Sequence, residues 1–424
     1  MSVAIQPYAA APHAPRLHYS VEMLRGALLW LTGLFGAFVF MEPSPYEILS
    51  LLAIVCFLVT GMALRLALMP LAALLVLYNI GFAIAVVPVL DQPKTLLWVL
   101  VSSYLSVTAL FFAVMLGENT ESRLRLLLNG YTTAAALAAA AGIIGYFRLL
   151  PGADLFVLYD RARGTFNDPN VLGAFLVLPA LLAFQRMLSG HLLQAARASL
   201  LFLLLLAGIF LSFSRGAWGQ FALAAAIIMV LEFITTRSAR GRVRIAIFAV
   251  FGVVALAALI TALLSLDQVA GLFKQRASLD QSYDIGHTGR FGRHVLGMLL
   301  VLDQPFGIGP LQFHKIFPED PHNAYLNAFV SGGWLSGFSY LALTAATLAT
   351  GLRFVFVTTP WRSTYLAVYA EFVGLAIESV IIDSDHWRHY FLVLGVLWGL
   401  MAASHTYVAR TRFAADVYRP ALRA

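Results

Sequence analysis

The sequence predicts an all-α polytopic membrane protein with about twelve transmembrane helices, on three observations. First, 60% of its 424 residues are hydrophobic and only 12% are charged, with a mean hydropathy of +0.82. A single soluble core could not bury so much apolar surface. Second, apolar runs of about 20 residues, long enough to cross about 30 Å of hydrocarbon, recur along almost the whole chain. Third, Lys and Arg concentrate in alternate connections between these runs.

The apolar runs define the expected spans in chain order. They cover residues 25–41, 46–64, 66–90, 95–116, 124–147, 170–185, 198–213, 217–235, 243–266, 323–352, 363–382 and 389–408. The first 26 residues lack the compact basic and apolar regions of a cleaved secretory signal, so we expect the first span to remain as an anchor. Cys56 lies inside the second span and, as the single cysteine, can form no internal disulfide.

The charge distribution predicts that both ends of the chain are cytoplasmic. Most Lys and Arg, including the "RSARGRVR" run at 237–244, fall on the side that also holds the N-terminus, and most acids fall on the other side. We therefore expect cytoplasmic tails at 1–24 and 409–424 around a transmembrane domain at 25–408. The net charge of +7 then reflects topology and attraction to anionic lipid rather than binding to nucleic acid.

Two long connections, 148–169 and 267–322, are expected on the outer face. Long ordered loops usually carry function. In the second loop, "GRFGRHVLGMLLVLD" (289–303) has apolar residues at helical spacing, which predicts a short interfacial helix. Its arginines, Arg290 and Arg293, would face either a site or the lipid headgroups.

Both outer loops end in an Asp-Pro pair followed by an apolar helix: "NDPNVLGAF" (167–175) and "EDPHNAYLNAF" (319–329). Each reads as an Asp cap with Pro at the first helical position. Two helix N-termini at the outer surface would attract phosphate through their free N–H groups. Alternatively, Asp-Pro simply starts a helix, which is the better interpretation of either loop alone. Two such starts, each after an arginine-bearing loop, favour a site.

Three arginines are expected on the same outer face: Arg163, Arg215 and Arg290. An arginine near hydrocarbon costs about 3 kcal/mol on insertion scales and is usually retained only with a partner. Arg215, at a tight turn between two apolar runs, could instead be a snorkelling interfacial residue. Three guanidinium groups and two helix N-termini would suit a pyrophosphate, because Arg binds phosphate oxygens in pairs and stays charged.

His322 is expected at the second or third position of the tenth span. There the positive helix end and the nearby arginines would keep its ring neutral near pH 7. A neutral imidazole can accept a proton and so act as a general base. The alternative is a histidine at a helix start that merely hydrogen-bonds to backbone.

Other ionisable residues lie near the eleventh span. The "DSDHWRH" run at 383–389 offers oxygen and nitrogen ligands, with His386 and His389 three residues apart. No ligand set closes at a recognised spacing, so no metal site is predicted. Glu371 and Glu378, seven residues apart, share one helical face. They could anchor an arginine, or mark a proton path in a transporter.

Four stretches, in this order, resemble the O-antigen ligase and polymerase superfamily of bacterial membrane glycosyltransferases: "RARGTFNDPNVLGAFL", "SFSRGAWGQ", "GRFGRHVLG" and "PHNAYLNAFVSGGWLSG". The resemblance is strongest from about residue 160 to 335. It implies a GT-C-like fold in the bacterial inner membrane. Members transfer a glycan from undecaprenyl diphosphate to a hydroxyl acceptor on the periplasmic face, with inversion and without a metal or other cofactor.

The resemblance also implies roles for individual residues. His322, Arg215 and Arg290 would be catalytic. The residues expected to bind the diphosphate or glycan are Arg163, Asn170, Arg293 and Asn323. The family's Gly-Arg motif is often followed by tryptophan, whereas His294 and Val295 stand there in this chain, which leaves the choice between Arg290 and Arg293 open.

Several functions remain compatible with these motifs. The acceptor could be lipid A-core, as in a ligase, a growing polysaccharide, as in a polymerase of O-antigen or exopolysaccharide repeats, or a protein. Protein glycosylation is less favoured, because some relatives of that type carry a large soluble domain that is not found here. A different class, a secondary transporter of a small anion, would use Glu371 and Glu378, but transporter sites lie near the bilayer midplane.

Overall fold

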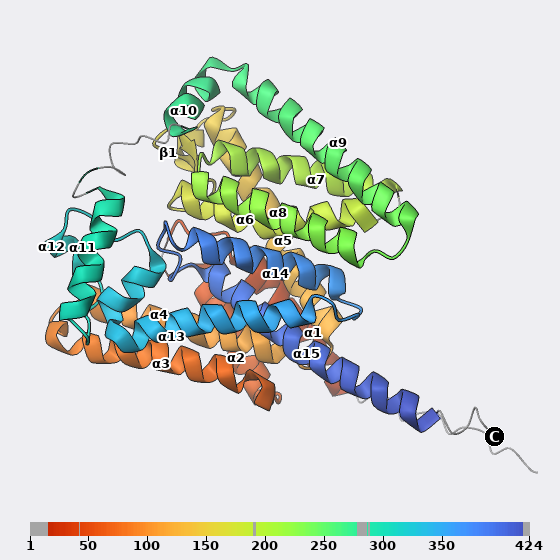
Figure 1. Ribbon diagram of the computed structural model, residues 1–424, viewed down its shortest axis with the longest axis horizontal. Coiled ribbons are helices and arrows are strands. Elements are labelled where there is room, and N and C mark those ends of the chain that lie inside the picture. Colours follow the sequence, from red (N-terminus) through yellow and green to blue (C-terminus); the bar gives the residue numbers. More distant parts are fainter. Residues whose placement is uncertain (1–15, 42, 190–191, 278–285, 287–288, 419–424) are drawn as a thin grey trace, which may run out of the picture.

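The protein is a bundle of long helices, described by a computed structural model for residues 16–41, 43–189, 192–277, 286 and 289–418. Most helices run along the long axis of the molecule (Figure 1). Its helices are α1 (Arg16–Phe35), α2 (Pro45–Val59), α3 (Met69–Ala85), α4 (Pro93–Met115), α5 (Thr120–Tyr146), α6 (Pro169–Ser189), α7 (Leu192–Leu211), α8 (Arg215–Thr235), α9 (Ala239–Leu264), α10 (Asp267–Ala277), α11 (Arg290–Asp303), α12 (Phe313–Ile316), α13 (Ala324–Phe354), α14 (Arg362–Glu378) and α15 (Arg388–Tyr418). Short 3-10 helices cover Leu66–Leu68, Val87–Val89 and Ala153–Phe156.

Each predicted span overlaps a helix of the structure, and the all-α polytopic class is confirmed. In the part of the chain that the structure describes, 9 helices are long and apolar enough to cross a membrane. The shorter helix α2 is also apolar. The number of crossings, their orientation and the GT-C-like arrangement stay predictions.

The first predicted span, 25–41, is displaced in the structure, because α1 runs from Arg16 to Phe35. After Phe35 the chain turns to meet the first outer loop. The Val39 N–H donates to the Thr165 carbonyl at 3.1 Å, and the Thr165 hydroxyl donates to the Ala37 carbonyl. Apolar residues 36–41 therefore belong to a docked turn, which hydropathy alone cannot distinguish from the end of a span. At the other end, α15 continues past residue 408 to Tyr418.

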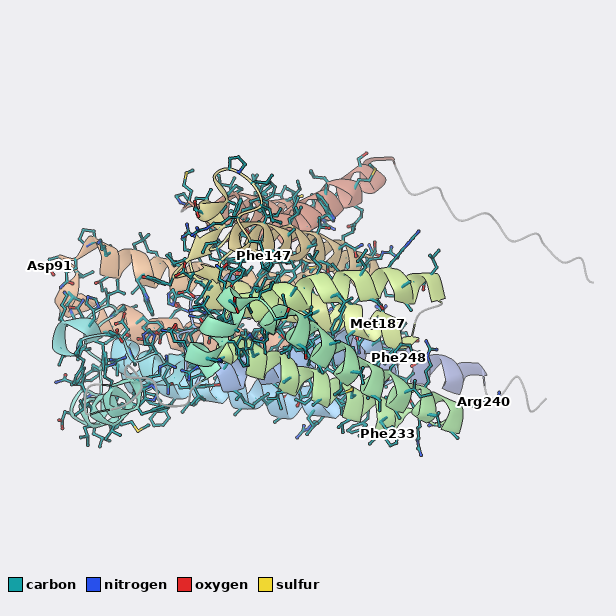
Figure 2. The ribbon with its side chains drawn as sticks, turned by 90° about the horizontal axis from the view of Figure 1, so that it is seen from above. Asp91, Phe147, Met187, Phe233, Arg240 and Phe248 are labelled. Carbon is teal, nitrogen blue, oxygen red and sulfur yellow. The ribbon has the colours of Figure 1, made fainter. Side chains whose placement is uncertain are left out.

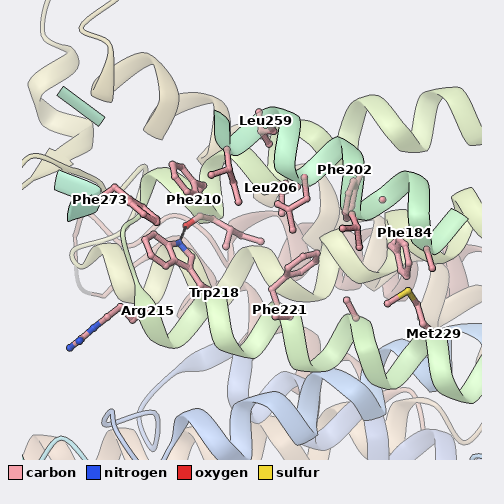
Figure 3. Close-up of a pocket in the computed structure, with 18 residues that line it drawn as sticks. Phe184, Phe202, Leu206, Phe210, Arg215, Trp218, Phe221, Met229, Leu259 and Phe273 are labelled. Carbon is pink, nitrogen blue, oxygen red and sulfur yellow. Dashed lines mark hydrogen bonds between the residues drawn. The ribbon is translucent and has the colours of Figure 1, made fainter. Parts of the chain in front are cut away.

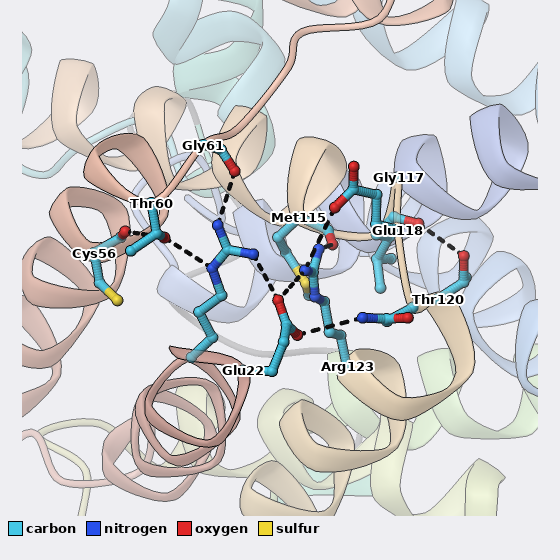
Figure 4. Close-up of polar contacts among 12 residues, drawn as sticks. Glu22, Cys56, Thr60, Gly61, Met115, Gly117, Glu118, Thr120 and Arg123 are labelled. Atoms are coloured by element: carbon cyan, nitrogen blue, oxygen red, sulfur yellow. Dashed lines mark hydrogen bonds and ion pairs between the residues drawn. The ribbon is translucent and has the colours of Figure 1, made fainter. Parts of the chain in front are cut away.

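The two ends of the bundle differ. Asp91 marks one end, whereas Arg240 lies at the other (Figure 2). The end with Asp91 also carries α11 and α12 (Figure 1). At the Arg240 end, a buried charge cluster joins α1, α5 and the connection after α2 (Figure 4). Glu22 Oε1 accepts from Arg25 at 2.6 Å and from Arg123 at 2.8 Å, while Arg25 Nε donates to Thr60 at 2.9 Å.

The predicted short helix of the second outer loop is present as α11. It lies across the end of the bundle rather than along it (Figure 1). Its face away from the protein is apolar, with Phe291, Val295, Met298 and Leu302 all more than half exposed. An amphipathic helix in this position suits the edge of a bilayer.

Helix α13 is interrupted at Gly333, where another segment docks against its backbone. Gly333 has φ 69°, and a Cβ there would lie 2.5 Å from the carbonyl carbon of Phe306. The Trp334 N–H donates instead to the Pro305 carbonyl at 2.8 Å. Gly307, also at positive φ, belongs to the same docked segment, and a Cβ there would lie 2.5 Å from the Gly333 nitrogen. The Gly-Gly pair of the "SGGW" motif thus lets the chain after α11 lie against the tenth predicted span.

Candidate active site

The tenth predicted span begins later than its Asp-Pro pair. Helix α13 starts at Ala324, and the Asn323 side chain caps it by accepting the Leu326 N–H at 3.0 Å. His322 has φ 50° and lies outside the helix. The prediction that Asp320 caps this helix, with Pro321 at its first position, is therefore wrong. Asn is as good a cap as Asp, and here it is the residue next to the helix.

His322 is held by Asp383, from the connection between α14 and α15. The distance from His322 Nδ1 to Asp383 Oδ2 is 3.1 Å, and Asp383 Oδ1 accepts the Asn323 N–H at 3.0 Å. One carboxylate thus fixes both the ring and the backbone beside it. A carboxylate at Nδ1 keeps a proton there and leaves Nε2 as the basic nitrogen.

Asp383 also shifts the pKa of His322 in the direction opposite to the one expected. The hydrogen bond to Asp383 raises the pKa of His322, and this outweighs burial and the positive charge of Arg290, which act in the opposite direction. The expected cause, the positive end of a helix, does not apply, because the ring lies outside α13 and its anionic partner shifts the pKa in the opposite direction. The ring is consequently a stronger base than expected.

Helix α11 brings two arginines towards His322. Arg290 donates to the Ile381 carbonyl at 3.5 Å, two residues from Asp383. Arg293 is 3% exposed and forms an ion pair with Glu319 at 2.8 Å. Glu319 Oε2 also lies 4.0 Å from His322 Nε2. Arg290 acts electrostatically on His322, whereas Arg293 ties α11 to the segment that precedes α13.

His294, at the position where tryptophan often follows the Gly-Arg motif, helps to place the same segment. Its Nε2 lies 2.8 Å from the Pro321 carbonyl, which can only accept, so this nitrogen carries the proton. Burial lowers the pKa of His294, in agreement with a neutral ring that serves as a hydrogen-bond donor. His294 therefore fixes the backbone just before His322.

Arg215 is the first residue of α8, and the carboxylate of Glu378 packs against the start of this helix. Ser214 caps α8 by accepting the Ala217 N–H at 3.3 Å. The next residue, Gly216, packs against Glu378 so closely that a Cβ there would lie 2.4 Å from Glu378 Oε1. Glu378 is the last residue of α14, five residues before Asp383. The contact joins the start of α8 to the segment that holds His322.

The first outer loop is fixed by Arg161, which the sequence did not single out. Its Nε donates to the Ser212 carbonyl at 2.7 Å and its Nη2 to Asn170 Oδ1 at 2.6 Å. Arg163, the expected phosphate ligand, instead donates to the Leu155 carbonyl of its own loop at 3.1 Å. The buried Arg161 therefore joins the start of α6 to the turn before α8. A second arginine two residues away, in "RARG", was the available signal.

The start of α6 agrees with its prediction. Pro169 is the first residue of the helix, and Asp168 Oδ1 accepts the Asn170 N–H at 2.6 Å. The Asn170 side-chain oxygen accepts from Arg161, and the expected role of Asn170 in binding substrate stays a prediction.

Glu371 and Glu378 share one face of α14, as their spacing predicts, and in the structure this face packs against α8. Glu371 Oε1 accepts from Gln220 at 2.8 Å. Glu378 is 3% exposed, and neither of its oxygens has a hydrogen-bond partner in the described part of the chain. Neither carboxylate forms an ion pair with an arginine among the residues that the structure describes.

The polar side chains of the "DSDHWRH" run make separate contacts with different parts of the protein. Besides Asp383, Asp385 accepts from the Asn327 amide at 2.9 Å, and the His386 ring lies 3.8 Å from that of Trp98. Within the described ranges, no group of three or more His, Cys, Asp and Glu side chains could hold a metal ion. A mechanism without a metal stays a prediction.

Comparison with known proteins gives one family match, which covers part of the chain. No curated protein matches the chain in sequence. Residues 200–341 match the family model described as O-antigen ligase, and this segment carries Arg215, Arg290, Arg293, His322 and Asn323. This segment is about a third of the chain, and over it the chain is similar to the O-antigen ligase family, in agreement with the resemblance that the sequence motifs indicate.

Proposed function

We propose that this protein is a membrane glycosyltransferase that moves a glycan from undecaprenyl diphosphate to a hydroxyl acceptor on the periplasmic face. The observation that carries the proposal is the His322–Asp383 contact beside Arg290, in a segment that matches O-antigen ligases. The geometry provides a basic nitrogen oriented by a carboxylate and cationic groups close to it, which is what transfer from a diphosphate requires.

In the proposed step, His322 Nε2 takes the proton of the acceptor hydroxyl while its oxygen attacks the anomeric carbon. The bond between this carbon and the diphosphate oxygen breaks from the opposite side, which inverts the anomeric configuration. The bond electrons leave with undecaprenyl diphosphate, and the proton remains on His322 until solvent removes it. Asp383 stabilises the imidazolium formed in this step.

The arginines act on the leaving group. Diphosphate gains negative charge as the bond breaks, and guanidinium groups placed in advance stabilise that charge. Arg290, at the outer end of α11, and Arg215, at the start of α8, are the proposed diphosphate ligands. Arg293 and Arg161 hold their own segments through Glu319 and Asn170, so they are positioning residues in this proposal.

Transfer by the purified, full-length protein with a synthetic undecaprenyl-diphosphate donor tests the proposal. His322→Ala should abolish transfer and keep donor binding. The matched control is His314→Ala, since His314 is an exposed histidine of the same loop with its own carboxylate neighbour, Asp320, at 3.5 Å. Near-normal turnover by the His322 variant would refute the assignment of the base.

The acceptor defines whether the protein is a ligase or a polymerase. A deletion strain of a ligase keeps long polymer on its lipid carrier, whereas a deletion strain of a polymerase accumulates single repeats. The transporter alternative would require uptake of a small anion into proteoliposomes that depends on Glu378. The cationic residues at one end of the bundle favour transfer at the membrane surface over a midplane transport site.

A further inference from the structure

Glu319 lies beside the nitrogen that acts as the base in the proposed step, and that step gives it no part. Its Oε2 is 4.0 Å from His322 Nε2. The same oxygen accepts from the buried Arg293 at 2.8 Å, which holds the carboxylate in place. Among the described residues, no hydrogen bond or ion pair involves the other oxygen, Oε1. Because the Glu319 side chain is 56% exposed, this oxygen can contact a molecule that enters the site.

The two edges of the His322 ring face different surroundings. At Nδ1 stands Asp383, at 3.1 Å, and Arg290 donates to the Ile381 carbonyl of the same segment. At Nε2 stands Glu319. An ionised carboxylate accepts hydrogen bonds and donates none, so its partner at the Nε2 edge must be a donor.

The diphosphate is assigned to other side chains, Arg290 and Arg215. At the start of α8 the Arg215 guanidinium points away from an apolar pocket of about 610 Å³ between α6, α7, α8 and α9 (Figure 3). A carboxylate is the wrong partner for a phosphate, because like charges side by side are unfavourable and neither group donates a hydrogen bond. Glu319 therefore suits the acceptor and not the leaving group.

A sugar acceptor supplies the required donor. Its nucleophilic hydroxyl has to donate to His322 Nε2 at about 2.8 Å. The oxygens of two neighbouring sugar hydroxyls lie about one hydrogen-bond length apart, so the second hydroxyl can reach a carboxylate oxygen that is 4.0 Å from Nε2. One pair of hydroxyls thus matches one pair of acceptors, the base nitrogen and the Glu319 carboxylate.

We propose that Glu319 determines acceptor specificity by binding an uncharged hydroxyl group next to the nucleophilic one. The inference rests on the proposed function, because it requires an acceptor hydroxyl at His322 Nε2. Two kinds of acceptor are then disfavoured. A serine or threonine side chain has no second hydroxyl, and a sugar with a phosphate or carboxylate next to the nucleophile brings a like charge to Glu319.

Acceptor use by the purified, full-length protein tests the inference, with the undecaprenyl-diphosphate donor held constant. A panel of methyl hexopyranosides and a serine-containing peptide serves as the set of acceptors. Analysis of the product identifies the sugar hydroxyl that becomes linked. The decisive probe is the deoxy analogue of that sugar, which lacks the neighbouring hydroxyl and keeps the nucleophilic one.

Glu319→Gln keeps the shape of the side chain and removes its charge. It should raise the KM for the complete sugar about tenfold or more, the expected loss of a hydrogen bond to a charged group. The wild type should show the same rise with the deoxy sugar, whereas Glu319→Gln should use the two sugars within about twofold of each other. The matched control is Asp320→Asn, since Asp320 is the next exposed carboxylate in the chain and contacts His314 at 3.5 Å. It should keep the wild-type preference.

The outcomes separate the inference from the proposed function. If Glu319→Gln loses activity equally with both sugars and so keeps the wild-type preference, Glu319 serves the Arg293 ion pair alone and the inference is overturned, while the transfer function stands. Equal use of the complete and deoxy sugars by the wild type overturns it without any variant, which covers the case of a Glu319→Gln protein that does not fold. Transfer to the serine peptide as efficient as transfer to the sugar also overturns it. If the wild type transfers to no member of the panel, the proposed function fails first.

Discussion

The substitution Asp383→Asn tests whether the Asp383 carboxylate orients the His322 ring, because it removes the carboxylate and leaves the other residues of the site unchanged. Asn can keep the contact with the Asn323 N–H through its carbonyl oxygen, but its amide cannot accept a proton from His322 Nδ1. The ring would then favour the tautomer with its proton on Nε2, the nitrogen that must act as the base. The substitution changes one acceptor while it preserves the shape of the side chain.

The size of the effect follows from the 3.1 Å contact. A hydrogen bond to a charged group contributes about 1.5–3 kcal/mol. Since the His322 side chain is 40% exposed, the lower part of this range applies, and kcat/KM should fall at least about tenfold. A larger loss, towards the roughly 10⁴-fold seen in serine protease triads, would indicate that the tautomer controls the rate.

The pH profile gives an independent measurement. Asp383 raises the pKa of His322, and the base works only when it is unprotonated, so wild-type kcat/KM should fall as pH decreases through this raised pKa. Without the carboxylate the pKa of His322 drops, and the acid limb of the profile should move to lower pH. The matched control is Asp385→Asn, since Asp385 pairs with Asn327 and not with His322. Wild-type activity with an unmoved acid limb in Asp383→Asn would refute the orienting role.

Three substitutions test the supports of the site by thermal unfolding in detergent. Arg161→Lys should lower the free energy of unfolding by about 1.5–3 kcal/mol, because lysine cannot form the paired contacts that include Asn170. An unchanged Tm would contradict this role of the buried Arg161. Gly333→Ala adds a Cβ at a residue with a left-handed backbone, where a neighbouring segment lies against it. It should lower the free energy of unfolding by about 1–3 kcal/mol. An unchanged Tm would show that α13 continues through Gly333 without a break. Gly216→Ala pushes Glu378 away and should reduce transfer more than it reduces Tm; equal losses would show a purely structural contact.

Hydropathy and charge were sufficient to predict the helices, because both depend on local composition. Each predicted run overlaps a helix, although the first is displaced, and Pro169 starts α6 as its Asp-Pro pair indicates. The Asp-Pro pair before α13 does not start that helix, because tertiary contacts favour Asn323 as the cap over Asp320, three residues earlier. Asp383 holds the backbone at Asn323 and the ring of His322, and no local pattern contains that information.

The sequence identified the types of residue at the site better than it identified which residues contact one another. His322, Arg215 and Arg290 were identified from motifs, but Asp383 was read only as a possible metal ligand. Its distance of 61 residues from His322 in the chain explains the omission, because a pairing across two helices leaves no spacing signal. Arg161 was missed for a different reason, since two arginines in "RARG" are equivalent until burial distinguishes them.

The short segment between α14 and α15 couples the parts of the site through its backbone. Its carbonyls at Ser379 and Ile382 accept the Ala324 N–H at 2.8 and 3.2 Å, and the Ile381 carbonyl accepts from Arg290. Because Asp383 follows in the same segment, a shift of the end of α14 would move the base and Arg290 together. Glu378 anchors that end against the start of α8, where Arg215 stands. In the proposed mechanism this one helix end would set the distance between the base and the diphosphate ligands, and the α8–α14 contact would then influence transfer without touching substrate.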